Sequence, residues 1–243
     1  MFRSKKNKKL CLICSTISLF LAASLPAQAV PIQVAITIDN SYALFFGTET
    51  EATTFVGSDY DWTTTEIYNF DLPEDHFLYV VTASDHWIAQ GFLGQFENLD
   101  TGYKFYSSDP QWQVMATGLG TNAPYSGSAT DLGLLTQEIL DANAGGNPSG
   151  GWVAPTAGPY NGDQPWSLRP NIDSAARWVW YSSNGDPDPT TPGYNHDEWL
   201  VFRIPVDAAP VIEPSLWVLL ATGLLSFRGM KRARRRQTPR TAP

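Results

Sequence analysis

"PIQVAITIDNSYALFFG", residues 31–47, contains two strand patterns separated by a turn signal, and it decides the class of the fold. Residues 31–38 alternate in character and are rich in Val and Ile, which favour extended backbone. Asp39-Asn40 is a turn-forming pair, and residues 41–47 form a second run of apolar and aromatic side chains. The stretch therefore predicts two β-strands with a tight turn between them.

Seven further runs of this kind follow, separated by residues rich in Gly, Pro, Asn and Asp. They cover residues 66–72, 76–84, 87–98, 103–108, 111–118, 177–183 and 198–206. The run 76–84 is apolar almost throughout, which is typical of a strand buried on both faces. Residues 131–146 have a helical pattern, with Thr130 or Asp131 as the expected N-cap and Gly145 as the expected end. Many short strands and one short helix predict an all-β fold, an antiparallel β-sandwich of the jelly-roll type.

Several of these runs resemble the galactose-binding-like jelly rolls. The resemblance is carried by "DNSYALFF" (39–46), Gly57, "DYDWTTTEIYNFDLPEDHFLYVVTAS" (59–84) and the closing runs "ARWVWYS" and "EWLVFRIPV". It spans most of residues 39–206, although residues 144–171 depart from the pattern. Domains of this group accompany bacterial glycosidases and occur in surface proteins, so the resemblance implies the same fold and a surface role.

The N-terminal segment has the features of a secretory signal. Arg3 and four lysines precede an apolar run over residues 10–25, and Ala27-Gln28-Ala29 follows as a small-x-small cleavage pattern. We expect a signal peptide over residues 1–29, cleaved after Ala29, with an uncleaved anchor helix as the alternative. Both cysteines of the chain lie inside it, so the exported domain is expected to have no disulfide and no cysteine metal site.

The charges are distributed unevenly along the chain. Five of the 16 basic residues lie in the signal and seven lie from Arg228 onward, which leaves Lys104, Arg169, Arg177 and Arg203. All 24 acidic residues lie between Asp39 and Glu213, so this region carries a formal charge of about −20. Such a field repels nucleic acid and anionic membranes, and it favours divalent cations and neutral partners such as sugars.

The C-terminal segment resembles a PEP-CTERM sorting signal. Glu213-Pro214-Ser215 precedes a short apolar stretch over residues 215–227, and a basic cluster follows at Arg228, Lys231, Arg232, Arg234, Arg235 and Arg236. Ile212 stands where the family has its first Pro. The resemblance implies that an exosortase-type membrane enzyme processes the tail. Independently of it, the basic cluster favours a cytoplasmic end, and 13 apolar residues are fewer than the about 20 of a comfortable bilayer crossing. A plain single-span anchor is the alternative with the same topology.

These features predict five segments. They are a signal peptide (1–29), an exported β-sandwich domain (30–207), a linker with the sorting motif (208–214), a short transmembrane helix (215–227) and a basic cytoplasmic tail (228–243). The precursor is expected in the inner membrane, and the product at the cell surface or in an extracellular polysaccharide matrix.

Three aromatic residues are candidates for ligand binding. Trp152, Tyr160 and Trp166 lie in a stretch too rich in Gly and Pro for a core element, with Asn161, Asp163 and Gln164 nearby. Exposed rings stack on the apolar face of a pyranose, and polar neighbours bind its hydroxyl groups. The alternative is that these rings fold back as a lid over the sandwich. The other exported tryptophans, including Trp178 and Trp180 two apart on one strand, are expected to pack in the core, with those two on a shared face.

Metal and catalytic signals are weak. Asp59 with Asp61, and Asn184 with Asp186 and Asp188, offer oxygen ligands near turns, so a structural calcium ion is possible but no ligand set is assigned. The three histidines match no zinc spacing, and no GxSxG elbow occurs. We therefore expect a non-enzymatic protein without a cofactor that binds polysaccharide. A self-associating matrix protein and a glycoside hydrolase are the alternatives.

Overall fold

The computed structural model describes residues 29–83, 89–119, 129–185, 188, 190 and 198–205. The predicted signal, sorting motif, short membrane helix and basic tail lie outside these residues, except for Ala29, which immediately precedes the first strand. Residues 84–88, which include His86 and Trp87, lie outside them as well, and so do Asp186 and His196. Within the described part of the chain, no helix is both long enough and apolar enough to cross a bilayer.

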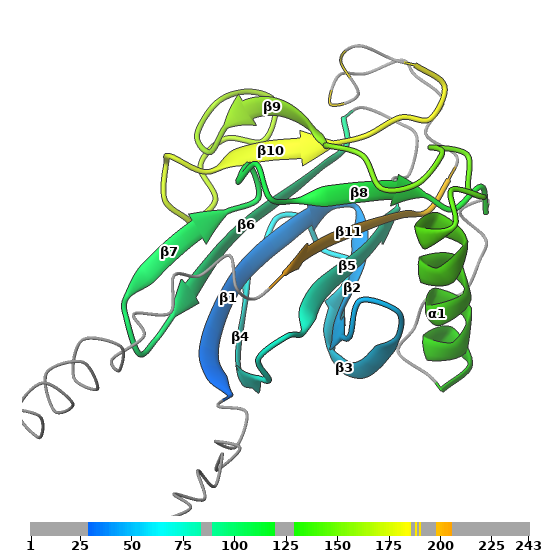
Figure 1. The fold of residues 1–243 in the computed structure, drawn as a ribbon. Coiled ribbons are helices and arrows are strands. Elements are labelled where there is room, and N and C mark those ends of the chain that lie inside the picture. Colours follow the sequence, from blue (N-terminus) through cyan, green and yellow to red (C-terminus); the bar gives the residue numbers. More distant parts are fainter. Residues whose placement is uncertain are drawn as a thin grey trace, which may run out of the picture.

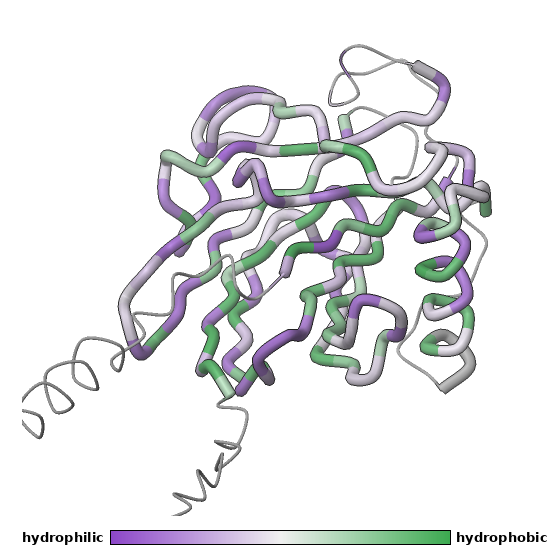
Figure 2. Tube along the Cα trace, in the orientation of Figure 1, coloured by the Kyte–Doolittle hydropathy of each residue, from purple (hydrophilic) through white to green (hydrophobic). Residues whose placement is uncertain are grey.

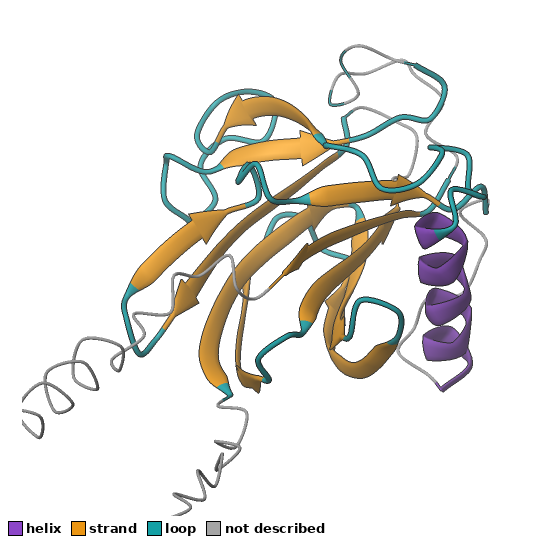
Figure 3. Ribbon diagram, viewed as in Figure 1, coloured by secondary structure: helices purple, strands orange, loops and turns teal. Residues whose placement is uncertain are grey.

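Two antiparallel sheets pack face to face, which confirms the predicted β-sandwich (Figures 1 and 3). The first, sheet A, has the order β4-β1-β6-β10-β9, with β7 also pairing with β6. The second, sheet B, has the order β3-β2-β5-β11-β8. The strands are β1 (Val30–Asp39), β2 (Ser41–Gly47), β3 (Ala52–Asp59), β4 (Glu66–Leu72), β5 (Phe77–Ala83), β6 (Gly91–Asn98), β7 (Tyr103–Tyr106), β8 (Gln113–Ala116), β9 (Thr156–Tyr160), β10 (Arg177–Trp180) and β11 (Leu200–Pro205).

All nine predicted strands are present, and the described residues contain two further strands, β3 and β9, that the sequence did not predict. β3 is rich in Thr and half exposed, and β9 contains Gly and Pro, so neither has the apolar alternation that reveals a strand. Both lie at sheet edges, where one side of the backbone needs no partner and the composition is less restricted. The turn at Asp39-Asn40 carries the chain from sheet A to sheet B, since β1 pairs with β4 and β6 while β2 pairs with β3 and β5.

The main core fills the space between the sheets. On β1, Ile32, Val34 and Ile36 point inward, and Leu78 and Val80 of β5 meet them from sheet B. Hydrophobic and hydrophilic residues alternate along several strands, as the colouring of the tube in Figure 2 shows. Burying this apolar area is the main stabilising term for a domain whose described residues contain no cysteine.

Each sheet is also covered on its outer face. Helix α1 (Ala129–Asn143) packs Leu135 and Ile139 against the outer face of sheet B, together with Tyr79 and Val81 of β5. β5 is thus buried on both faces, as predicted. The loop of residues 161–176 covers part of the outer face of sheet A.

The ends of α1 differ partly from the prediction. The helix begins at Ala129, so Thr130 and Asp131 lie within its first turn and neither precedes it as an N-cap. Its end is as predicted, because Gly145 has a φ of 73° and its N–H donates to the Ala142 carbonyl. The next N–H, of Gly146, donates to the Asp141 carbonyl, which completes a Schellman motif.

Trp178 and Trp180 are both fully buried, as expected, but they do not share a face. Trp178 packs in the outer cluster on sheet A, whereas Trp180 packs in the core between the sheets, with its ring 6.1 Å from that of Phe202. The pairing of β9 with β10 shifts register between Arg177 and Val179. Such an irregularity adds local twist, and a strict period of two no longer predicts which face a side chain takes.

Candidate functional site

Arg203 is a buried cation on the outer face of sheet B. In β11 its neighbours Phe202 and Ile204 point into the main core, so Arg203 points outward, and it is only 6% exposed. Strand register places it opposite Tyr79 of β5 and Gln113 of β8. Its Nε donates to Oε1 of Gln113 (2.9 Å), which satisfies part of a guanidinium group that is costly to bury unpaired.

The helix end and the following turn place the ring of Trp152 beneath this arginine. The side chain of Asn147 organises the turn, because its amide donates to the Ala116 carbonyl of β8 and its Oδ1 accepts from the Gly151 N–H at 2.6 Å. Val153 then pairs with Val114 of β8 through two backbone hydrogen bonds. Trp152, held between these anchors, lies with its ring centroid 3.9 Å from the Arg203 guanidinium carbon.

Asn143, the last residue of α1, joins the ring and the cation. Its Oδ1 accepts from the indole Nε1 of Trp152 (2.7 Å) and from Nη1 of Arg203 (3.1 Å). Its amide nitrogen donates to the Glu49 carbonyl (3.0 Å), which ties the β2–β3 turn to the end of the helix. The rings of Trp152 and Phe77 both lie within cation–π distance of Arg203, at 3.9 and 5.1 Å.

These residues line an open groove of about 610 Å³ at the junction of α1, sheet B and the β2–β3 turn. The volume lies in the range typical of small-molecule sites. The lining is formed by Glu49, Thr50, Ala142, Asn143, Ala144, Gly145, Gly150, Gly151, Trp152 and Arg203. It combines an aromatic ring, a guanidinium, an amide, a hydroxyl and a carboxylate, and we call it the Trp152 groove.

The electrostatics of the Trp152 groove are mixed in sign. Burial lowers the pKa of Arg203, while Tyr79 and Glu49 act in the opposite direction, and an arginine stays charged at neutral pH. Burial also raises the pKa of Tyr79 to about 12, so this phenol is neutral and donates to the Thr48 carbonyl at 2.6 Å. The C-terminal end of α1 adds partial negative charge beside Glu49. A ligand therefore meets both donors and acceptors.

The three predicted ligand-binding aromatics are not brought together. Trp152 lines the groove on sheet B, whereas Tyr160 ends β9 at the edge of sheet A. Tyr160 is 49% exposed, and the guanidinium carbon of Arg177 lies 4.8 Å from its ring centroid. Tyr160 is thus a separate, exposed ring that contributes nothing to the groove.

Trp166 requires a correction, because it is not an exposed platform. It is 2% exposed and stacks on Trp178, with ring centroids 4.1 Å apart and an interplanar angle of 19°. Its indole N–H donates to Oδ2 of the buried Asp39 at 2.7 Å. Trp166 takes the alternative role of a lid that folds back over sheet A. It covers apolar side chains on the outer face of that sheet, which water would contact if the lid were absent.

The polar neighbours of Trp166 also serve the lid. Asn161 is buried, its amide nitrogen donates to the Arg169 and Ile172 carbonyls, and its Oδ1 accepts from the Arg169 N–H. The Arg169 guanidinium lies over the Trp62 ring and donates to the Trp62 and Thr63 carbonyls. These groups hold the loop in place and do not face a ligand site.

Asp59 and Asp61, the first of the two groups that offered oxygen ligands for calcium, make turn contacts. Oδ2 of Asp59 accepts from the Asp61 N–H, and Oδ1 of Asp61 accepts from the backbone and hydroxyl of Thr63, which lowers the pKa of Asp61. Among the residues that the structure describes, no group of three or more His, Asp or Glu side chains lies close enough to hold a metal ion. The second acidic run includes Asp186, which lies outside the described residues.

Of the residues that line the Trp152 groove, the sequence analysis named Trp152 as a candidate but not Arg203, Asn143 or Glu49. Arg203 carried a usable signal, because a single arginine inside an apolar strand must find partners when it is buried. Glu49 carried none, since one carboxylate among 24 acidic residues is uninformative.

No protein-family model, curated protein or solved structure matches this chain. The functional interpretation therefore depends on the geometry of the site and on the sequence features described above.

Proposed function

We propose that this chain is an exported, non-enzymatic carbohydrate-binding protein of the cell surface or the extracellular polysaccharide matrix, and that the Trp152 groove is its sugar site. One observation carries the proposal: an indole ring is fixed by Arg203 and Asn143 at the wall of an open groove that also contains a carboxylate. A ring that is already immobilised loses little conformational entropy when a ligand stacks on it.

A neutral sugar matches the groups that line the groove. Its C–H face packs on an aromatic ring, and its hydroxyl groups both donate and accept hydrogen bonds. Glu49 offers a carboxylate acceptor, while Thr50 offers a hydroxyl that can donate or accept. A strongly anionic ligand would meet Glu49 and the negative end of the helix, and a strongly cationic one would meet Arg203.

The same lining favours binding over hydrolysis. Glycosidases generally use two carboxyl groups on opposite sides of the scissile bond. Glu49 is the one carboxylate among the described residues that line the groove. The groove therefore lacks a second acid or base in the described part of the chain, and sugar binding is the simpler use of these residues.

We extend the proposal to the fold type of the sandwich and to the cellular location of the protein. Successive strands pass repeatedly between the sheets, with β4, β6 and β7 in sheet A and β5 and β8 in sheet B, which supports a jelly roll of the galactose-binding-like kind. The sorting-signal resemblance and the basic cluster support processing by an exosortase-type enzyme after insertion in the inner membrane. Mass spectrometry of the surface or secreted form tests this, and peptides from Met230 onward on that form would contradict it.

The sugar site is tested with the full-length chain, purified in a mild nonionic detergent and applied to a glycan array. We expect binding to neutral glycans, and we expect Trp152→Ala to weaken it at least tenfold. Because this change also removes the ring beneath Arg203, Thr50→Ala with Glu49→Gln is a second variant that leaves the ring and the cation in place and should also weaken binding.

Tyr160→Ala is the matched control, because Tyr160 is likewise a ring beneath an arginine but lies away from the groove. It should leave binding unchanged. The proposal fails if the folded chain binds no glycan, or if both groove variants bind like the original chain.

A further inference from the structure

The outer face of sheet A carries a straight row of polar side chains across four strands. Strand pairing places Asn69 of β4 opposite Gln33 of β1, Gln33 opposite Glu97 of β6, and Glu97 opposite Lys104 of β7. We call Asn69, Gln33, Glu97 and Lys104 the polar row. Neighbouring strands lie about 4.8 Å apart, so the row extends roughly 14 Å across the sheet.

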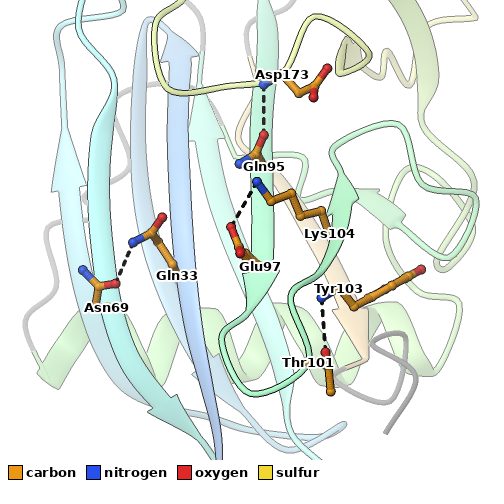
Figure 4. A network of polar contacts seen from close by, with 8 residues as sticks. All are labelled: Gln33, Asn69, Gln95, Glu97, Thr101, Tyr103, Lys104 and Asp173. Carbon is orange, nitrogen blue, oxygen red and sulfur yellow. Dashed lines mark hydrogen bonds and ion pairs between the residues drawn. The ribbon is translucent and has the colours of Figure 1, made fainter. Parts of the chain in front are cut away.

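The side chains of the polar row are ordered by contacts with one another. Nε2 of Gln33 donates to Oδ1 of Asn69 (3.0 Å), and Nζ of Lys104 lies 3.2 Å from Oε2 of Glu97 (Figure 4). Asn69 and Lys104 are exposed, whereas Gln33 and Glu97 are half-buried. Each amide keeps donors and acceptors beyond the single bond between them.

The adjoining row is less polar and forms one side of the same face. Ile67 of β4 pairs with Ala35, Ala35 pairs with Gln95, and Gln95 pairs with Tyr106 of β7. Ile67 is 47% exposed, and Tyr106 is half-buried against the cluster beneath the lid. Gln95 is held by the Asp173 N–H, which donates to its Oε1 at 2.9 Å (Figure 4). Apolar and aromatic groups thus border the polar row.

The charge of this face identifies the kind of partner it fits. The polar row has two neutral amides and one ion pair that cancels itself, within a region of about −20. Asp71 and Asp173 lie at its two borders, which disfavours an anionic partner. A neutral, hydroxyl-rich polymer meets no net charge on the row and finds both donors and acceptors there.

We propose that this face binds a neutral, extended polysaccharide chain, and that it acts together with the Trp152 groove to cross-link two chains. Arg203 and Trp152 belong to the outer face of sheet B, and the polar row belongs to the outer face of sheet A. The two surfaces therefore point away from each other, with the sandwich between them. One molecule bound to two polymer chains links them, and the avidity of such a link exceeds the affinity of either site.

The cross-linking step rests on the proposed function of the groove, but the polar row is a separate binding surface. The full-length chain in mild detergent is mixed with galactomannan, a neutral polymer, or with alginate, an anionic one. Affinity electrophoresis reports binding, and light scattering reports cross-linked particles. We expect retardation and increased scattering with galactomannan, and much weaker effects with alginate.

The informative variant is Gln33→Thr with Asn69→Thr. It replaces both amide side chains with shorter hydroxyl side chains and keeps residues that favour a strand. It should still be retarded through the groove, but its scattering should fall at least fivefold. Asn69→Thr alone, at an exposed position on an edge strand, should give a partial loss and serves if the double variant does not fold. Gln137→Ala, an exposed amide on α1, is the matched control and should behave like the original chain.

The outcomes separate the two proposals. If the double variant scatters within twofold of the original chain, the proposal that the polar row binds polysaccharide is overturned. The groove proposal still stands in that case if Trp152→Ala loses binding. If the double variant is no longer retarded but Trp152→Ala still is, the groove does not bind the polymer. That result overturns both the groove proposal and the cross-linking proposal. Particles that form without polysaccharide, and that the double variant abolishes, would show that the face binds a second copy of the chain. No binding to either polymer overturns the proposal for the polar row and the cross-linking, and the glycan array then decides the groove proposal separately.

Discussion

Replacing Arg203 by Lys should destabilise the domain by about 2–4 kcal/mol although the charge is kept. Lysine has no planar fork, so the substitution disrupts the hydrogen bonds to Gln113 and Asn143 and the stacking on Trp152. Loss of one hydrogen bond to a charged group costs about 1.5–3 kcal/mol. Loss of a partly desolvated cation–π contact costs about 0.5–2 kcal/mol. One lost hydrogen bond and the lost cation–π contact sum to about 2–5 kcal/mol. The ammonium can still donate to one of the two acceptors and recovers part of this cost, which gives the stated range.

The measurement is urea unfolding of the full-length chain in mild detergent, followed by tryptophan fluorescence. For a domain of this size, each 1 kcal/mol lowers Tm by about 2–4 °C, so a fall of roughly 4–16 °C should accompany the shift in midpoint. Lys104→Gln is the control, because Lys104 is 42% exposed and its ion pair with Glu97 is worth at most about 1 kcal/mol. If the unfolding free energy of Arg203→Lys lies within about 0.5 kcal/mol of that of the original chain, the hypothesis that the Arg203 guanidinium holds the groove together is refuted.

Three further predictions concern the lid, the helix end and a buried carboxyl. Trp166→Ala should lower the unfolding free energy by about 3–5 kcal/mol in chemical denaturation, because it removes a buried ring stacked on Trp178 and the donor to Asp39; a change below about 1 kcal/mol would mean that the lid is not packed as described. Gly145→Ala should cost about 1 kcal/mol in the same assay, since its φ of 73° strains a residue with a Cβ, whereas the helical, unobstructed Gly133→Ala should be neutral or stabilising. Burial, with a smaller effect of Asp141, raises the pKa of Glu138 above its ordinary 4.5, so the folded state binds this proton more tightly than the unfolded state does. Glu138→Gln should therefore raise Tm at pH 7, and the gain should shrink as the pH falls through the raised pKa. Thermal melts at several pH values test this, and a gain in Tm that does not depend on pH would contradict it.

Local patterns in the sequence were enough to predict most of the sandwich. The alternation in residues 31–38 and the continuous apolar run 76–84 predict strands β1 and β5, because the period of side-chain exposure follows directly from strand geometry. Gly145 predicts the end of α1 for an equally local reason, since the left-handed conformation there favours a residue without a Cβ. The uneven distribution of charge is likewise a property of the sequence alone.

The candidate site depends on contacts that no local pattern contains. Tyr79, Gln113 and Arg203 meet because three strands far apart in the chain pair in one register. Trp152 reaches Arg203 through a turn that is fixed by the side chain of Asn147 and by the pairing of Val153 with β8. Tertiary packing also decided that Trp166 is buried while Tyr160 is exposed, although both lie in the same Gly- and Pro-rich stretch. The physical reason is that burial depends on which apolar surface a ring can cover after folding, whereas the sequence around it specifies only its local backbone preferences.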